Sequence, residues 1–356
     1  MRHTMKKQDT TGNRETNRAQ TATTELTAPE LAASANISMT SLRYIVAVDT
    51  YRNFVRAAEA CGVTQPTLSA GIRSLESALD VTVFDRGAHP VRPTALGERI
   101  IAQARKTLHN ASLIEELVAV EKGDESGKAT IGIIPTIAPY ILPGLFRTIH
   151  SGHPTVHLEV SEMRTKFIIE KLLAAELDMA ILATPLGQKD LLEIPLYYEK
   201  FVAYISPSDE LYNLNEIPAD RLSSDRLWIL EEGHCLRSQV FNFCHSRRHN
   251  RPEYQAGSID TLVRIVNANG GYTVIPEMHT AFLTEEQHRN LRPIVRRDNG
   301  APASGCPTCV PVREVSLVIR EDFVRERLLN VIAGCIRQTV PEEMLDSRLK
   351  RFAIRL

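Results

Sequence analysis

The sequence predicts an α/β protein with a winged helix-turn-helix at its N-terminal end. Residues 57–76 have the pattern of two helices joined by a glycine turn, and a long amphipathic helix follows Thr94. From residue 129 onwards, strand patterns alternate with helix patterns, which predicts a mostly parallel sheet covered by helices. Because single hydrophobic cores rarely exceed about 250 to 300 residues, a chain of 356 residues should form two or three units.

The composition is that of a globular protein. Apolar residues make up 43% and charged residues 24% of the chain, and the net charge of −1 gives no global sign of nucleic-acid binding. The longest apolar run, at 131–146, is broken by Gly and Pro and is too short for a membrane span. The basic N-terminus has no apolar stretch after it, so we predict no secretory signal and a cytoplasmic location.

Residues 1–38 are rich in Thr, Ala, Asn and Gln and are predicted to be a disordered tail. The first domain is predicted at 39–98, with a helix from Ser41, a break at 51–53 and a second helix up to Cys61. Thr64 is a good N-cap for the next helix, and Pro66 fits its first turn. That helix carries one apolar face, formed by Leu68, Ile72, Leu75 and Leu79.

Residues 81–94, VTVFDRGAHPVRPT, predict a small hairpin or wing, because β-branched residues flank a Gly and Pro loop. The apolar stripe of the following helix continues to about Lys122, and we assign 99–124 as a linker and dimerisation helix. A helix of this length exceeds what a small winged domain needs. We therefore expect it to pack against a second copy of the chain.

An effector domain is predicted at 125–340, followed by a tail at 341–356. Residues 123–128, GDESGK, have the composition of a linker, and the stretch at 166–184 reads as a helix that leads into a strand. Further strands are expected at 129–136, 153–162, 200–206, 227–230, 271–276 and 314–320.

The stretch AAEACGVTQPTLSAGIRSLE (57–76) resembles the LysR-type transcriptional regulators, as do LRYIVAVDTYRNF before it and LDVTVFDRGAHPVRPTALGE after it. The resemblance implies a winged helix-turn-helix, a dimerising linker helix and a periplasmic-binding-protein-like effector domain of two α/β subdomains. It also implies double-stranded promoter DNA as a partner, assembly as a homodimer or homotetramer, and RNA polymerase as a further partner. We predict no cofactor and no membrane partner.

A helix beginning after Thr64 would point several polar residues away from its apolar face, where they could reach base edges and phosphates in a major groove. These candidates are Gln65, Pro66, Thr67, Ser69 and Arg73. Near the wing, Arg86 and Arg92 would contact the DNA backbone, together with Thr94. The alternative is a helical corner inside an enzyme, but the order of helices, wing and linker helix favours the regulator.

The stretch LEEGHCLRSQVFNFC (230–244) resembles the OxyR branch of the LysR family, in which peroxide oxidises the first cysteine and the second resolves it. Chemistry supports such a role, because a thiolate is the nucleophile toward peroxide. Cys235 follows the Gly233 break and lies beside His234 and Arg237, so we predict a lowered thiol pKa. Ser238 departs from the family, which usually has an acidic residue there. The alternative is that Cys235 and Cys244 are two ordinary buried thiols.

The spacing of these two cysteines has a geometric consequence. If 236–243 are helical, nine residues advance the chain about 13 to 14 Å and turn it by roughly 900°. A disulfide needs Cα atoms within about 7 Å, so the bond requires the helix to unwind. Unwinding would withdraw Val240, Phe241 and Phe243 from their packing sites, which makes the segment a switch with two arrangements.

Further peroxide-site residues are implied by the same resemblance. Thr136, in IGIIPTIAPYILP, and Thr165, in SEMRTKFI, match hydroxyls that would bind peroxide, and Arg313 matches a cation near the site. Such groups would polarise the O–O bond and stabilise the leaving oxygen. The alternatives are that Thr136 caps the helix after Pro135 and that Arg313 is a surface charge.

The other four cysteines carry weaker signals. Cys306 and Cys309 form a CxxC in a Pro-rich loop. Because a zinc site normally needs four ligands and this motif supplies two, we predict that no metal binds and that the two thiols are inert. The alternative is an exposed dithiol or an adventitious metal site. Cys61 and Cys335 lie on apolar helical faces and are predicted to be core residues.

Three other functions compete with the peroxide regulator. One is a LysR-type regulator that responds to a small metabolite bound between the effector subdomains. A thiol peroxidase or disulfide oxidoreductase would leave residues 41–94 unexplained, and a two-lobed solute-binding protein would need a signal peptide. We therefore predict that the protein is not an enzyme.

Overall fold

The computed structural model describes residues 37–121, 127–222, 225–244, 256–295 and 310–353. Its contacts divide the chain into one unit that ends at Thr94 and a second that begins at Ala95, four residues before the predicted start of the linker region at 99. The tail predicted at 1–38 lies outside the described residues, apart from 37 and 38. Among the described residues, no helix is both long enough and apolar enough to cross a membrane.

The first unit contains the predicted helices. They are α2 (Met39–Tyr51), α3 (Phe54–Ala60) and α4 (Gln65–Leu79). A side-chain cap begins each helix: Ser38 accepts from the N–H of Ser41, Asn53 from those of Val55 and Arg56, and Thr64 from that of Thr67. The predicted apolar faces form the core, in which Leu42, Ile45, Val48, Leu68, Ile72 and Leu75 are buried.

The wing is a short antiparallel hairpin of β1 (Phe84–Asp85) and β2 (Arg92–Pro93). Glu76 of α4 holds it in place. One carboxylate oxygen accepts from the backbone N–H of Val83 at 2.8 Å and of Phe84 at 3.3 Å, and the other pairs with Arg86 at 2.8 Å. The wing is thereby fixed to the helix that carries the predicted DNA contacts.

The second unit begins with α5 (Ala95–Glu121), a helix of 27 residues. Ile101 and Ala104 are buried, whereas Ile114, Leu117 and Val118 are more than half exposed. These three exposed apolar residues share one face of the helix because they lie three and four positions apart. Packing of this face against a second copy stays a prediction.

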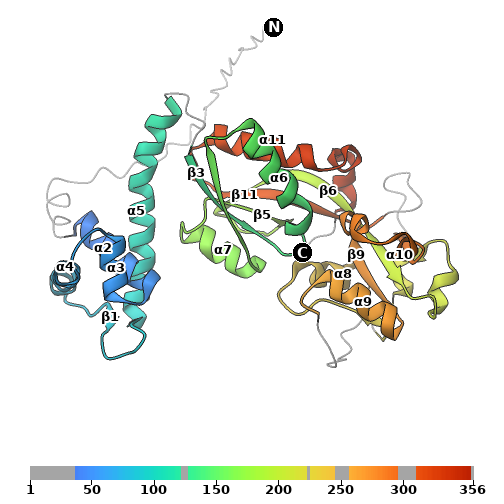
Figure 1. Cartoon of the computed structure of the whole chain (residues 1–356), viewed down its shortest axis with the longest axis horizontal. Helices are drawn as coiled ribbons and strands as arrows, with labels where there is room; N and C mark the ends of the chain where they lie inside the picture. The colour runs from blue at the N-terminus through green and yellow to red at the C-terminus, as the bar shows by residue number, and fades with distance from the viewer. Residues whose placement is uncertain (1–36, 122–126, 223–224, 245–255, 296–309, 354–356) are drawn as a thin grey trace, which may run out of the picture. The chain divides into compact units, whose positions relative to one another are not determined.

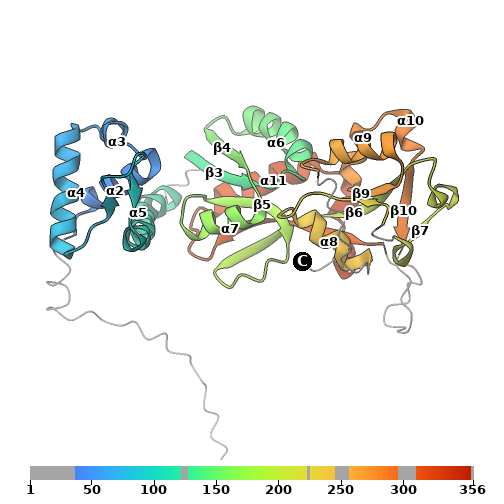
Figure 2. The same cartoon turned by 90° about the horizontal axis from the view of Figure 1, so that it is seen from below.

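The first subdomain is built on β3 (Gly127–Ile133), β4 (Val156–Glu162), β5 (Met179–Thr184) and β11 (Val312–Arg320), together with the first half of β6 (Leu191–Ile205). Helices α6 (Ala138–Gly152) and α11 (Glu326–Thr339) pack together on one face of this sheet, and α7 (Thr165–Leu173) covers the other (Figures 1 and 2). All three helices contribute to one apolar core.

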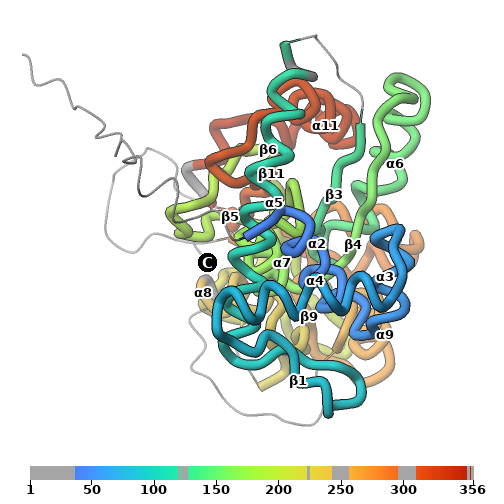
Figure 3. The backbone as a smooth tube through the Cα atoms, turned by 90° about the vertical axis from the view of Figure 1, so that its left-hand side faces the viewer, coloured from blue at the N-terminus to red at the C-terminus, as the bar shows by residue number. Residues whose placement is uncertain are grey.

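The second subdomain uses the second half of β6, with β7 (Ile217–Pro218), β8 (Leu227–Trp228), β9 (Tyr272–Pro276) and β10 (Leu291–Val295). Helices α8 (Cys235–Cys244), α9 (Ile259–Asn269) and α10 (Glu285–His288) complete it, and Figure 3 shows α9 beside β9. Short 3₁₀ turns join these elements: η1 (Glu210–Asn213), η2 (Ala219–Arg221) and η3 (Glu277–Phe282). A separate apolar core fills this subdomain. The predicted α/β architecture with two effector subdomains is therefore confirmed.

The prediction of a mostly parallel sheet is wrong. β3 is parallel to β4 and β5, but β11 is antiparallel to both β5 and β6, and β6 is antiparallel to β9 and β10. β11 is the strand that returns from the second subdomain to the first and enters between β5 and β6. Alternation of helices and strands along the chain does not reveal the direction of such a returning strand.

Several predicted boundaries also differ. β3 begins at Gly127, inside the stretch predicted as linker, and β6 is much longer than the predicted 200–206. The predicted C-terminal tail instead folds onto the second unit through η4 (Glu342–Leu345) and η5 (Ser347–Phe352). Met344 is buried in the first core, and Ala353 forms an isolated parallel bridge with Val312.

Candidate functional site

The predicted redox helix begins where the two subdomains meet. The loop before it contains Gly233, whose φ of 96° lies in the left-handed region that favours glycine. A Cβ atom there would lie 3.0 Å from Cδ of Arg164. Arg164 precedes α7 in the first subdomain and forms an ion pair with Glu231 of the second. The loop before Cys235 is therefore held to the opposite subdomain by a charge pair.

Cys235 is the first residue of α8 and is only 8% exposed. Burial raises the pKa of its thiol, and the nearby Arg313 guanidinium, the Thr165 and Thr136 hydroxyls and the Leu236 N–H lower it only in part. The predicted lowered pKa is therefore wrong in direction, because desolvation outweighs the groups that favour a thiolate. Burial thus disfavours the thiolate, while the Arg313 cation and two hydroxyls lie where they favour it.

Arg313 is the cation of this site and is completely buried, so the alternative of a surface charge is wrong. Its Nη1 donates to Thr136 Oγ1 at 3.2 Å, and its Nη2 donates to the Thr136 carbonyl oxygen at 2.9 Å. Nε donates to Glu199 at 2.7 Å. Thr136 does not cap α6, since Ile137 is the N-cap residue and makes no side-chain cap.

Several buried polar atoms at this site form no hydrogen bond to the described residues. They are the Tyr197 hydroxyl and both amide atoms of Gln239. Buried polar groups without partners cost free energy, so pairing of these atoms with a small molecule that both donates and accepts would be favourable. Gln239 lies four residues after Cys235 on the same helix, a spacing that could have marked it as a site residue. Nothing in the local sequence marks Tyr197.

His234 and Arg237, the basic neighbours of Cys235 in the sequence, contact other residues. His234 is buried, with its Nε2 3.7 Å from Glu231, and its pKa is lowered by burial and by Arg164. Arg237 donates to the Leu230 carbonyl oxygen at 3.1 Å and stacks over the Phe241 ring. Arg237 therefore braces the start of α8, and its role beside the thiol stays a prediction.

Cys244 is the last residue of α8, and the described backbone is helical between the two cysteines. Helical rise separates their Cα atoms by about 13 to 14 Å, which is too far for a disulfide. Val240 is buried and Phe241 is half-buried, in line with the predicted packing face. The side chain of Phe243, Cys306 and Cys309 lie outside what the structure describes.

The remaining described cysteines differ from each other. Cys335 is buried in the first core, as predicted. Cys61 is half-buried in the turn that ends α3, so its assignment to a core helical face is wrong. Within the described ranges, no group of three or more His, Cys, Asp or Glu residues is placed to hold a metal ion.

The predicted DNA surface is mostly accessible. Gln65, Pro66, Thr67 and Arg73 of α4 are exposed. Ser69 is the exception, because it is only 7% exposed and lies three residues before the buried Ile72, on the edge of the apolar face.

At the wing, Arg92 is exposed. Arg86 pairs with Glu76 and lies over the Phe54 ring, with its Cζ atom 5.7 Å from the ring centre. Arg86 therefore stabilises the wing through these two contacts, in addition to its predicted contact with the DNA backbone.

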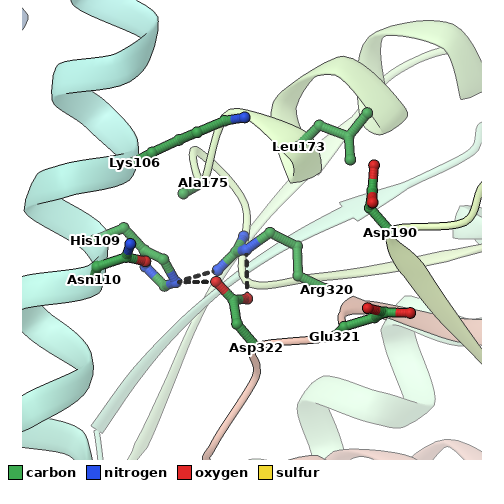
Figure 4. A pocket seen from close by; sticks show the side chains of 9 residues that line it. All are labelled: Lys106, His109, Asn110, Leu173, Ala175, Asp190, Arg320, Glu321 and Asp322. Atoms are coloured by element: carbon green, nitrogen blue, oxygen red, sulfur yellow. Dashed lines mark hydrogen bonds and ion pairs between the residues drawn. The ribbon is translucent and has the colours of Figure 1, made fainter. Parts of the chain in front are cut away.

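A cavity of about 250 Å³ lies between α5 and the first subdomain (Figure 4). Its lining includes Lys106, His109 and Asn110 from α5, and Arg320 and Asp322 from the end of β11 and the turn after it. Arg320 Nη2 lies 2.5 Å from His109 Nε2, and Nη1 of the same guanidinium donates to the carbonyls of Leu172 and Leu177. Burial and Arg320 lower the pKa of His109, which favours a neutral ring that accepts from Arg320.

Comparison with known proteins places this geometry in a family. Residues 39–98 match the model of the bacterial regulatory helix-turn-helix proteins of the LysR family, and residues 122–341 match the LysR substrate binding domain. The chain is 31% identical to the hydrogen peroxide-inducible genes activator of Haemophilus influenzae, over 87% of this chain and 99% of that protein. It is 36% identical to the HTH-type transcriptional regulator EstR of Acinetobacter baylyi, over 85% of this chain and 96% of that protein.

Among solved structures, a full-length OxyR variant from Pseudomonas aeruginosa matches with a TM-score of 0.68 and 34% identity. The match covers 84% of this chain and 97% of that chain. Both halves of the sequence, and the order of their folds, therefore agree with one family. The chain belongs to the LysR family of bacterial regulatory helix-turn-helix proteins, and within it to the OxyR type.

Proposed function

We propose that this protein is a DNA-binding transcription regulator that responds to hydrogen peroxide through oxidation of Cys235. The observation that carries the proposal is the placing of the buried Cys235 thiol beside the Arg313 cation and the Thr136 and Thr165 hydroxyls. The names of several relatives, which are peroxide-inducible genes activators, support the same effector. The unpartnered amide donor and acceptor of Gln239 suit a molecule as small and polar as peroxide.

In the proposed first step, the Cys235 thiol loses its proton and the sulfur attacks one oxygen of hydrogen peroxide. An S–O bond forms, the O–O bond breaks, and the second oxygen leaves as hydroxide, which takes up a proton to become water. The sulfur is oxidised by two electrons to a sulfenic acid, and the peroxide is reduced. Arg313 and the threonine hydroxyls stabilise the thiolate and the negative charge that develops on the leaving oxygen.

In the proposed second step, the Cys244 thiolate attacks the Cys235 sulfenic sulfur, the S–O bond breaks, and a second water leaves. The product is a disulfide between the two residues, and the two thiols together have lost two hydrogens. Because α8 keeps these residues apart, this step requires the helix to unwind. Leu236 and Val240 would leave the second core, at a cost of about 1.5 to 3 kcal/mol for each buried side chain.

We assign α4 and the wing to double-stranded promoter DNA, with Gln65, Pro66 and Thr67 at the bases and Arg73 and Arg92 at backbone phosphates. The exposed apolar face of α5 would join two copies into the dimer from which a tetramer is built. RNA polymerase is the proposed downstream partner, and the cytoplasm is the proposed location.

The experiment compares three forms of the full chain on its own upstream DNA: reduced, peroxide-treated, and Cys235→Ser treated with peroxide. Mass spectrometry of the peroxide-treated protein should show a loss of about 2 Da from a Cys235 to Cys244 bridge. Footprints should differ between the reduced and treated forms, and the Cys235→Ser footprint should stay that of the reduced form. Identical footprints in all three forms would overturn the peroxide response.

A second candidate is a LysR-type regulator whose effector is a small metabolite between the subdomains. The 36% identity to EstR, a regulator whose name mentions no peroxide, favours keeping this candidate. The mass measurement separates the two proposals. Under the second candidate, dilute peroxide leaves Cys235 and Cys244 as thiols, and a metabolite alone changes the footprint.

A further inference from the structure

Glu199 is a buried carboxylate that the proposed chemistry does not use. It lies in the middle of β6, and its side chain is completely inaccessible to solvent. Both of its oxygens are occupied. Oε2 lies 2.7 Å from Nε and 2.7 Å from Nη2 of Arg313, and Oε1 accepts from the backbone N–H of Met278 at 2.8 Å. The carboxylate therefore ties Arg313 of β11 to the start of η3.

The two contacts from Glu199 fix the orientation of the whole Arg313 guanidinium. That group is planar, and its five N–H donors have a rigid arrangement. With the Nε and Nη2 edge held by Glu199, Nη1 and the second hydrogen of Nη2 reach the hydroxyl and carbonyl oxygens of Thr136. Arg313 therefore stands between Glu199 and Thr136, with a hydrogen bond on each side.

This arrangement also orients the Thr136 hydroxyl. A threonine hydroxyl has one hydrogen to donate and can accept through its lone pairs. Because Oγ1 accepts from Arg313, its single hydrogen is left to point toward another acceptor, and the Cys235 sulfur lies close enough for this hydroxyl to favour the thiolate. A misplaced guanidinium would release the hydroxyl to rotate.

We propose that Glu199 is a positioning residue for peroxide oxidation: it holds Arg313 so that the guanidinium and the Thr136 hydroxyl face the sulfur and the leaving oxygen. Glu199 itself touches neither the thiol nor the peroxide. This role rests on the proposed oxidation of Cys235, since a site with no peroxide chemistry needs no such alignment.

A purely electrostatic role predicts the opposite result. Removing the Glu199 charge would leave Arg313 as an unbalanced cation beside Cys235, and an unbalanced cation favours the thiolate. If charge alone mattered, Glu199→Gln would speed every reaction of the thiol. If position matters, the variant slows the reaction with peroxide, because the Gln amide group presents its own N–H donors to Arg313 or Met278 and forces the guanidinium to tilt.

The test uses two reagents on the full chain. Iodoacetamide alkylates the thiolate without needing an activated leaving oxygen, whereas peroxide needs both the thiolate and the aligned donors. Loss of the free Cys235 thiol is followed by mass spectrometry at several pH values for the unmodified protein, Glu199→Gln and Glu199→Asp. For Glu199→Gln, the ratio of peroxide rate to iodoacetamide rate should fall about 10- to 100-fold. Glu199→Asp, which keeps the charge on a shorter side chain, should give a ratio between that of the unmodified protein and that of Glu199→Gln.

Asp209→Asn is the matched control. Asp209 is also a buried carboxylate that accepts from one backbone N–H, that of Leu211, and pairs with one arginine, Arg226. It lies in the second subdomain and takes no part in the proposed site. Loss of the Asp209 charge should leave the ratio of the peroxide rate to the iodoacetamide rate unchanged, even where it lowers the melting temperature.

The outcomes separate the positioning role from the proposed function. If the unmodified protein shows no reaction of Cys235 with peroxide, the proposed function fails. If it reacts and Glu199→Gln keeps the same ratio of rates, the positioning role is overturned while the proposed function stands. Should Glu199→Gln not fold, Glu199→Asp takes its place, and a ratio equal to that of the unmodified protein overturns the role.

Discussion

Arg320 at the end of β11 donates to the ring of His109 on α5, with 2.5 Å between the two nitrogen atoms. Through this contact, a buried side chain of the effector sheet is bonded to the linker helix. The same guanidinium donates to the carbonyl oxygen of Leu172, near the end of α7, and to that of Leu177, in the segment that joins α7 to β5. The contact needs a neutral imidazole, because a protonated ring has no acceptor to offer.

We predict that this contact weakens as the pH falls. His109 faces Arg320, Asp322 and Asp178, and its pKa is lowered by burial first and by Arg320 next. Since the folded pKa lies below the unfolded one, the unfolded chain binds more protons between these two values, and stability falls as the pH drops through about 6.5. The melting temperature of the unmodified protein should therefore fall relative to that of His109→Gln between about pH 7.5 and 5.5.

Glutamine is the suitable replacement because its Oε1 can accept from Arg320 without titrating. Half-buried carboxylates such as Glu116, whose pKa is raised, shift stability in the opposite direction, but they are present in both proteins and cancel in the comparison. Equal pH dependence in the two proteins would contradict the predicted role of His109.

We predict that the reaction of Cys235 with peroxide speeds up with pH. Burial raises the pKa of the thiol, so the thiolate is a minor form at neutral pH. The rate should rise by about tenfold per pH unit as long as the pH stays below that pKa. Stopped-flow measurement in a Cys244→Ser background isolates this first step. A rate that is flat from about pH 6 to 8 would mean that the thiol is already ionised there.

We predict that Gly233→Ala destabilises the loop before α8. The φ of 96° and the Arg164 side chain 3.0 Å from the new Cβ both oppose a side chain, and the expected loss is about 1 to 3 kcal/mol. Urea unfolding measures it. Gly334→Ala in α11 is the control, because no atom lies within 4 Å of its new Cβ and alanine in a helix should gain about 0.5 to 1 kcal/mol.

We predict that Thr64→Ala lowers the stability of the first unit by about 1 kcal/mol. The Thr64 hydroxyl accepts from the N–H of Thr67 and begins α4, so its loss leaves a helix donor without a partner. Thr64→Ser keeps the cap and should be close to neutral. Chemical denaturation read by circular dichroism would show the difference, and equal losses for both variants would argue against the cap.

We predict that Arg73→Ala weakens promoter binding and lowers the salt dependence of the affinity by about one phosphate contact. The exposed position of Arg73 on α4 is the basis. Ser69→Ala is the matched variant on the same helix, and its salt dependence should not change because Ser69 is buried. Fluorescence anisotropy across a salt series distinguishes the two.

The helices of the first unit could be predicted because their signals are local. Caps at Thr64 and Asn53 and apolar residues three and four positions apart fix these elements without any long-range contact. Pro195 in β6 and Pro293 in β10 concealed two strand segments, since proline within a run argues against a strand. The antiparallel direction of β11 depends on where the chain returns, which no local pattern contains.

The candidate site shows the same limit. Cys235 and its helix follow from a short motif, but the cation that acts on the thiol is Arg313, from a distant strand, rather than the adjacent Arg237. Sequence neighbours at a helix start diverge by about 100° per residue, so proximity along the chain does not imply proximity to the sulfur. Glu199 and Tyr197 were missed because a charged or hydroxylic residue inside a strand gives no sign of its partners.

Cys235 packs in the core of the first subdomain, whereas Leu236, the next residue, packs in the core of the second. The peptide bond between them therefore joins two independent cores. In the proposed oxidation, Leu236 and Val240 are the apolar side chains that leave their packing, and both belong to the second core. A reaction at a sulfur of the first core would thus change the packing of the second.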